Sequence, residues 1–279
     1  ALCRSGAPGE RRLRRSLGGA VELRPDLTAP AVVERLRRIE CDLLVSWFWT
    51  TRIPRALLEA PRLGTLGVHP SLLPRHRGPD PYFWALDAGD AVTGVTAHAL
   101  AEDYDTGAIY GQTELPIDAS WNAWTLARRL DHPSLALLRA TAARFARGEV
   151  VASWPQDPRL VTLAPAPDDD LLELDFRRTA VAVERRVRAA APTPGAYTHL
   201  GDEPVTLTRV RALAHAPKAL LPGEAFAVAR AGDVVTHAAV GCGEGAVELL
   251  EGYVDGEGGG LTVLDAAALA RLALGSPDV

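Results

Sequence analysis

Apolar positions along the first half of the chain alternate between helical spacing and short uninterrupted runs. Within residues 30–40, apolar side chains recur at positions 32, 33, 36 and 39, which predicts an amphipathic helix. Residues 41–49 and 65–69 are apolar without alternation, as expected for strands buried on both faces. The same patterns predict strands at 91–100 and 108–116 and helices at 81–88, 120–130 and 134–147. Helices that alternate with strands indicate an α/β fold.

The second half of the chain has a different pattern. Residues 154–170 contain four prolines and an acidic triplet, which are typical of a linker. A helix is predicted at 176–190, followed by short apolar runs between glycines at 205–210, 225–229, 234–240 and 246–250 and by a helix at 264–274. The short runs predict a small β-barrel or sandwich. We therefore expect two domains, 1–155 and 171–279, joined by a linker at 156–170.

Composition excludes several classes of protein. No apolar stretch reaches the roughly 18 residues of a membrane span, and no signal-peptide pattern is visible. The three cysteines, Cys3, Cys41 and Cys242, are scattered, which argues against a disulfide scaffold and against a cysteine zinc site. We expect a cytoplasmic protein without membrane contact.

Charge is distributed unevenly over the two halves. The whole chain has a formal net charge of −5, with 29 arginines and a single lysine against 35 acidic side chains. Residues 151–279 hold eleven basic and eighteen acidic side chains, a net charge of −7, whereas residues 1–150 carry +2. Because basic surfaces attract nucleic acids, the acidic second half disfavours such a partner.

Two loops carry candidate catalytic side chains. His69 ends the predicted strand 65–69 and begins the loop HPSLLP, and Asp105 lies in the loop EDYDTG at 102–107, after the strand 91–100. Ligands bind at the carboxyl ends of strands in open α/β sheets, and a carboxylate can fix the tautomer of a neighbouring histidine. Each loop alone is also typical of a surface turn, but together they predict a site that contains both side chains.

The histidines farther along the chain lack the spacing of metal ligands. None of them forms an HxH or HxxxH pair, so we predict no metal site and no metal cofactor. These residues are His98, His132, His199, His215 and His237.

The two loops resemble those of a known enzyme family. The segments HPSLLPRHRG and TGVTAHALAEDYDTGAI are similar to the 10-formyltetrahydrofolate-dependent formyltransferases, and most of all to methionyl-tRNA formyltransferase. Segments 192–197 and 241–250 resemble the C-terminal domain of that enzyme. The resemblance implies a Rossmann-like, mostly parallel sheet with helices on both faces in a catalytic domain at 1–155, and an OB-like β-barrel at 171–279. It also implies that about one βα unit precedes Ala1.

By this resemblance, His69 and Asp105 match the catalytic histidine and aspartate of the family. The family's catalytic asparagine lies two residues before the histidine, where this chain has Gly67. In formyl transfer an amine attacks the formyl carbon, so a base must take its proton and a donor must bind the oxyanion. Loss of one oxyanion donor typically lowers the rate about 10²–10³-fold. Gly67 therefore leaves three alternatives: another group replaces the amide, the activity is weak, or the protein catalyses another reaction or none.

The resemblance also implies the co-substrate 10-formyltetrahydrofolate. In the family, the loop after the third strand and the DTG loop enclose the pterin, and consecutive aromatic residues in the first loop suit stacking on a flat heterocycle. Packing of Trp47 and Trp49 in the core is an equally good interpretation of these positions. The implied folate-binding residues are Trp47, Phe48, Trp49, Ser71, Leu72, Leu73, Pro74, Asp103 and Tyr104.

The formyl acceptor is expected to be a primary amine of a small molecule, an amino sugar or an aminoacyl group. Methionyl-tRNA is an alternative from the family, but the acidic second half disfavours it. A short arginine cluster at 4–15 lies where the family has a tRNA-binding insertion, and it also fits a solvated surface segment. Because of Gly67, a degenerate folate-binding homologue and a formyl-folate hydrolase are further alternatives.

Overall fold

The computed structural model describes residues 2–3, 10–17, 22–23, 25–47, 49, 51–217, 220–256 and 259–275. Its first half contains β1 (Leu2–Cys3), α1 (Glu10–Leu17), β2 (Glu22–Leu23), α2 (Pro30–Arg38), β3 (Leu44–Ser46), α3 (Arg55–Leu58), β4 (Thr65–His69), α4 (Pro81–Ala88), β5 (Val92–His98), β6 (Ile109–Pro116) and α5 (Ala123–Ala146). The second half contains a 3-10 turn (Pro158–Leu160), α6 (Asp169–Leu172), α7 (Ala180–Ala190), β7 (Ala196–Leu200), β8 (Glu203–Leu213), β9 (Ala225–Ala231), β10 (Val234–Gly241), β11 (Ala246–Asp255), β12 (Leu261–Asp265) and α8 (Ala266–Leu274). No helix within these described ranges has the length and apolar character to cross a membrane.

Four of the described strands form the larger sheet of the first half, in the order β3-β4-β5-β6. β3 and β4 are parallel, whereas β5 is antiparallel to both β4 and β6, and β1 and β2 form a separate parallel pair. The predicted α/β class is confirmed. The described strands mix parallel and antiparallel pairs, in part because the connection 99–108 between β5 and β6 is too short for a parallel crossover.

Helix α5 covers one face of this sheet and contacts β4, β5 and β6. Its buried face repeats with helical spacing at Leu126, Leu130, Leu138 and Phe145. The sequence predicted two helices here, but α5 is continuous through Pro133. Proline removes one backbone hydrogen bond from a helix. Burial of apolar side chains on both sides of Pro133 outweighs that loss.

One antiparallel sheet forms the second half, in the order β7-β8-β11-β10-β9, and β12 pairs with β11. Helix α8 contacts β7, β9, β10, β11 and β12, so the sheet curls around this helix. The β-rich second half predicted from the glycine-separated apolar runs is therefore confirmed.

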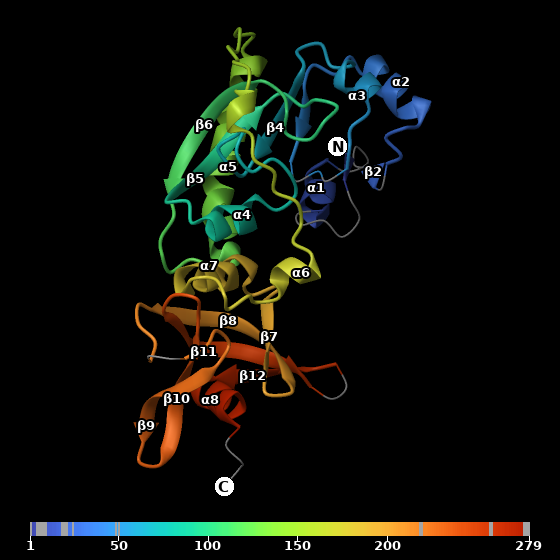
Figure 1. Cartoon of the computed structure of the whole chain (residues 1–279). Helices are drawn as coiled ribbons and strands as arrows, with labels where there is room; N and C mark the ends of the chain where they lie inside the picture. Colours follow the sequence, from blue (N-terminus) through green and yellow to red (C-terminus); the bar gives the residue numbers. More distant parts are fainter. Residues whose placement is uncertain are drawn as a thin grey trace.

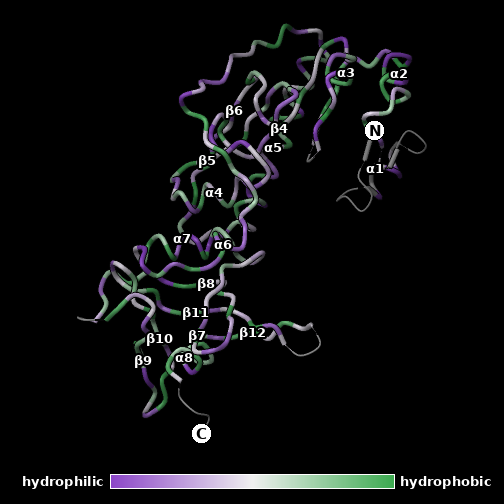
Figure 2. Tube along the Cα trace, turned by 45° about the vertical axis from the view of Figure 1, so that its right-hand side comes forward, coloured by the Kyte–Doolittle hydropathy of each residue, from purple (hydrophilic) through white to green (hydrophobic). Residues whose placement is uncertain are grey.

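The two halves share one hydrophobic core. A continuous cluster of buried side chains includes Phe83, Leu86 and Leu126 in the first half and Val187 and Leu249 in the second. Helices α4 and α7 contact each other directly. Figure 1 shows the two sheets at opposite ends of the molecule, with α6 and α7 between them, and the view turned by 45° in Figure 2 agrees.

Candidate active site

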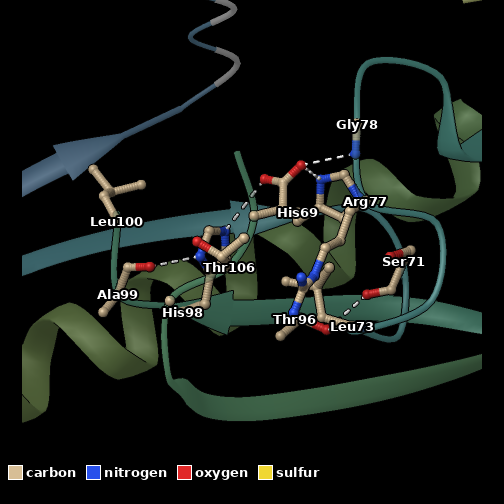
Figure 3. Close-up of polar contacts among 12 residues, drawn as sticks. His69, Ser71, Leu73, Arg77, Gly78, Thr96, His98, Ala99, Leu100 and Thr106 are labelled. Carbon is tan, nitrogen blue, oxygen red and sulfur yellow. Dashed lines mark hydrogen bonds and ion pairs between the residues drawn. The ribbon is translucent and has the colours of Figure 1, made fainter. Parts of the chain in front are cut away.

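His69 and Asp105 come together at one end of the central strands. His69 is the last residue of β4, and it pairs with Thr96 of β5. Asp105 lies in the loop between β5 and β6. Nδ1 of His69 is 3.5 Å from Oδ2 of Asp105, and Figure 3 shows the polar contacts of His69 beside these strands. The structure thus places side by side the two side chains that the sequence predicted as partners.

The buried His69 side chain is held through its second ring nitrogen. Nε2 lies 2.7 Å from the carbonyl oxygen of His76. Because a carbonyl only accepts hydrogen bonds, Nε2 carries the hydrogen of the neutral ring and Nδ1 carries the lone pair. The lone pair of Nδ1 therefore points toward Asp105 and is available to accept a proton from another group.

Asp90 holds the loop that presents this carbonyl. His76, whose φ is 57°, places its Nε2 2.7 Å from Oδ2 of Asp90. Arg75 donates to both carboxylate oxygens of Asp90, at 2.7 and 2.9 Å. Burial raises the pKa of Asp90, but the hydrogen bonds from Arg75 and His76 outweigh burial and hold its pKa below the usual value. Asp90 is therefore ionised and anchors both side chains.

Asp105 lies in a tight turn that residues far along the chain stabilise. Its φ is 58°, and its Oδ2 accepts a hydrogen bond from the backbone N–H of Gly78 at 2.9 Å. Gln156, in the predicted linker, donates to the carbonyl oxygens of Asp105 and Gly107 at 2.7 and 2.8 Å. A Cβ atom at Gly107 would lie 1.8 Å from the Ala99 carbonyl oxygen, so the turn requires glycine there.

Gly67 and His98 face each other across β4 and β5, where they are register partners. A Cβ atom at position 67 would lie 3.3 Å from Nε2 of His98 and 2.6 Å from Cδ2 of Leu100. His98 therefore fills part of the space that a longer side chain at position 67 would need. Its Nε2 lies 3.8 Å from Oδ1 of Asp105, and its Nδ1 lies 2.7 Å from the Ala99 carbonyl oxygen. One carboxylate thus lies between two buried imidazoles.

Burial is the largest influence on both imidazoles, and it lowers the pKa of His69 and of His98. The negative charge of Asp105 acts in the opposite direction on both, but it does not cancel the effect of burial. Both rings are therefore neutral at neutral pH. Each presents a nitrogen lone pair toward the same carboxylate.

We expect the folded protein to lose stability as the pH falls below about 6.5. In the unfolded chain His69 and His98 titrate at about 6.5, whereas in the folded protein their pKa values are lower. Between the two values the unfolded chain binds more protons, so acid lowers the free energy of unfolding, and above about 6.5 the effect is absent. Tm measured from pH 8 to pH 5 should fall less steeply for His98→Gln than for the wild type. Equal slopes would contradict this assignment.

A cavity of about 210 Å³ opens onto this cluster. The residues of the cluster that line it are Gly67, His69, His98 and Asp105. The predicted folate-binding residues that line it are Trp49, Asp103 and Tyr104. The structure therefore gathers these predicted residues around one cavity.

The sequence allowed Trp49 to be either a core residue or a residue of the binding cavity, and in the structure it is both. It packs against the buried cluster around Leu57, and it also lines the cavity. Its Nε1 is buried and has no hydrogen-bond partner among the residues that the structure describes. Buried N–H groups are rarely left unpaired, so this indole fits a ligand with an acceptor atom.

The remaining predicted folate-binding residues lie elsewhere. Those that are described but outside the cavity lining are Trp47, Ser71, Leu72, Leu73 and Pro74; Phe48 is outside the described residues. Ser71 is fully buried and donates through Oγ to the Arg75 carbonyl, and the Leu73 N–H donates to Oγ1 of Thr96. These contacts fix the loop after β4. Residues 71–74 therefore hold His69 in position and do not line the cavity.

Three further residues of the site were not predicted from the sequence: His76, His98 and Gln156. His98 was considered only as a metal ligand, although its place at the end of a predicted strand just before the DTG loop was a usable signal. Gln156 lies 51 residues from Asp105, and no local pattern connects the two. His76 acts through its backbone carbonyl, which sequence does not reveal.

Comparison with known proteins identifies the family. The family model described as formyl transferase matches residues 18–141, and the model of the formyl transferase C-terminal domain matches residues 168–257. The chain belongs to the formyl transferase family. Formyltransferases are enzymes, so the resemblance of the two loops and the enzyme class inferred from it are confirmed.

Similar proteins cover both halves of this formyltransferase. The methionyl-tRNA formyltransferase of Phenylobacterium zucineum is 36% identical over 246 residues, which cover 87% of this chain and 76% of that protein. The methionyl-tRNA formyltransferase of Citrifermentans bemidjiense is 34% identical over 228 residues, covering 82% and 69%. HypX from Aquifex aeolicus, solved in complex with tetrahydrofolic acid, shares the fold with a TM-score of 0.65 at 22% identity. That match covers 97% of this chain and 47% of HypX, so this chain spans about half the length of HypX.

Proposed function

We propose that this formyltransferase transfers the formyl group of 10-formyltetrahydrofolate to a primary amine. The observation that carries the proposal is the pair formed by the buried, neutral His69 and the Asp105 carboxylate on the wall of one cavity. A positioned base of this kind typically contributes about 10²–10⁴-fold to a rate. Formyl transfer needs such a base because the attacking nitrogen must lose a proton.

The reaction can be followed through bonds and protons. The amine nitrogen forms a bond to the formyl carbon, and the carbonyl electron pair moves to the oxygen. Nδ1 of His69 takes the proton of that nitrogen, and Asp105, 3.5 Å away, balances the charge of the imidazolium. When the carbonyl forms again, the bond to N10 of the folate breaks and N10 takes the proton from His69. The amine has then lost one proton and N10 has gained one.

The same cavity supplies groups for the folate. We propose that Trp49, whose Nε1 has no partner within the described part of the chain, and the loop residues Asp103 and Tyr104 hold the co-substrate. The guanidinium of Arg52 lies 3.4 Å from Asp103 and 5.7 Å from the centre of the Tyr104 ring, so it ties these two residues together. An aromatic and polar wall of this kind suits a flat heterocycle that carries amide groups.

We propose a small amine as the acceptor. Residues 151–279 carry a net charge of −7, which repels phosphates. A tRNA bound to this half would place its phosphates against that negative charge. Methionyl-tRNA is the second candidate acceptor, because relatives with that name are 34–36% identical over most of this chain.

A turnover assay with 10-formyltetrahydrofolate tests the proposal. Release of tetrahydrofolate is measured with methionyl-tRNA, a nucleotide-linked amino sugar, free methionine, or buffer alone. We expect a small amine to accelerate release over buffer. Acceleration by methionyl-tRNA alone would establish the second candidate, and equal release in buffer would indicate a hydrolase. Folate binding without any turnover would contradict the proposed function.

A further inference from the structure

At position 67 the site lacks a side chain, and the imidazole of His98 lies beside the empty position. Gly67 has no side chain, so it cannot donate a hydrogen bond from a side chain to the formyl oxygen. Its register partner His98 places Nε2 only 3.3 Å from where the Cβ of residue 67 would be. Both residues line the cavity. The imidazole of His98 therefore stands next to the place from which a side chain at position 67 would act.

We infer that His98 is a further catalytic residue, which takes one proton from the ammonium group of the acceptor and then donates a hydrogen bond to the formyl oxygen. This inference rests on the proposed function, because it assigns a second proton acceptor to the same reaction. Nδ1 of His98 lies 2.7 Å from the Ala99 carbonyl oxygen, so Nδ1 carries the hydrogen of the neutral ring. The lone pair is then on Nε2, the nitrogen nearest to position 67.

The proton balance of the reaction requires two proton acceptors in the protein. At neutral pH a primary alkyl amine is mainly an ammonium ion, which has no lone pair with which to attack. The first proton goes to Nε2 of His98 and frees the nitrogen lone pair. After attack the nitrogen carries a positive charge, and its second proton goes to His69 and on to N10. The remaining proton stays on His98 until the product leaves, when it is released to solvent.

The charges around His98 suit this sequence of steps. Asp105 faces it from the loop after β5, with Oδ1 3.8 Å from Nε2, and stabilises the imidazolium. His69 on β4 and Arg77 in the following loop oppose a positive charge there. When attack produces the oxyanion, one more negative charge appears in the cavity and is matched by the imidazolium N–H of His98. Burial keeps the pKa of free His98 low, so the ring is neutral when the acceptor arrives.

Three variants test the inference with the acceptors of the turnover assay: His98→Ala, His98→Gln and the double variant Gly67→Asn/His98→Ala. We expect His98→Ala to lower kcat about 10²–10³-fold, the usual effect of losing one oxyanion donor, with little change in the KM for folate. The double variant places an amide in the space that His98 leaves, once the flexible Leu100 side chain, whose Cδ2 would lie 2.6 Å from the new Cβ, turns aside, and it should recover at least about tenfold. If His98 only packs the strand pair, KM and stability will change, and the double variant will not recover activity.

The pH profile separates a proton acceptor from a structural role. For the wild type, kcat/KM should be level between about 6.5 and the pKa of the amine, because His98 deprotonates the bound acceptor. For His98→Gln only the free amine can react, so kcat/KM should rise about tenfold per pH unit up to the pKa of the amine. Parallel profiles for the two proteins would overturn the inference.

A structure with a stable donor analogue tests the position of the oxygen without an acceptor. In a complex with 10-formyl-5,8-dideazafolate we expect the formyl oxygen to point toward the imidazole of His98, without a hydrogen bond, because the unprotonated Nε2 and the carbonyl oxygen are both acceptors. A formyl oxygen that points away from His98 would overturn the inference. This measurement does not depend on turnover, so failure of the proposed function with every acceptor would be recognised separately.

Discussion

Replacing His69 by alanine lowers kcat/KM for formyl transfer about 10²–10⁴-fold, which is the usual contribution of a positioned base. The variant lacks Nδ1, the acceptor that lies 3.5 Å from Asp105. Folate binding should remain, because Trp49, Asp103 and Tyr104 line the cavity independently of His69. Release of tetrahydrofolate and binding of 10-formyl-5,8-dideazafolate measure the two effects separately.

Asp105→Asn and the double variant with His69→Ala complete this test. Groups that act as a unit give strongly non-additive losses. The double variant should therefore be about as slow as His69→Ala alone. The matched control is His132→Ala, since His132 is exposed on α5 and outside the cavity lining. A His69→Ala variant that is as active as this control would contradict the proposed mechanism.

The local parts of the site could be predicted from short stretches of sequence. The predicted strand 65–69 has the same bounds as β4, so His69 was correctly placed at a strand end. The helix predicted at 81–88 has the same bounds as α4, and the Asp80 carboxylate caps it by accepting from the Phe83 N–H. Strand ends and helix caps depend on neighbouring residues only.

The non-local parts could not be predicted in this way. Gly67 was identified as a departure from the family pattern, but its relation to His98 depends on the antiparallel register of β4 and β5. The role of Gln156 depends on how residues of the expected linker fold back onto the DTG turn. Strand register and loop docking result from packing of the whole domain, so a single sequence does not show them.

Replacing Arg186 by alanine lowers the free energy of unfolding by about 3–5 kcal/mol, the usual cost of leaving one partner of a buried ion pair alone. Arg186 of α7 donates to both carboxylate oxygens of Asp87 in α4, at 2.7 and 3.0 Å. It also donates to the Leu171 carbonyl, and its guanidinium lies 5.6 Å from the centre of the Phe83 ring. Only 9% of the Arg186 side chain and 11% of the Asp87 side chain are exposed. Urea denaturation of wild type and variant measures the difference.

The double variant Arg186→Met/Asp87→Leu shows whether charge burial causes this loss. Two apolar side chains need no partner, so the double variant should lose less free energy of unfolding than Arg186→Ala alone. The control is Arg209→Ala at the ion pair with Glu251, whose side chains are 60% and 50% exposed. An exposed pair typically contributes less than about 1 kcal/mol. If Arg186→Ala costs no more than Arg209→Ala, this ion pair does not hold the two halves together, and the shared apolar core between α4 and α7 does so alone.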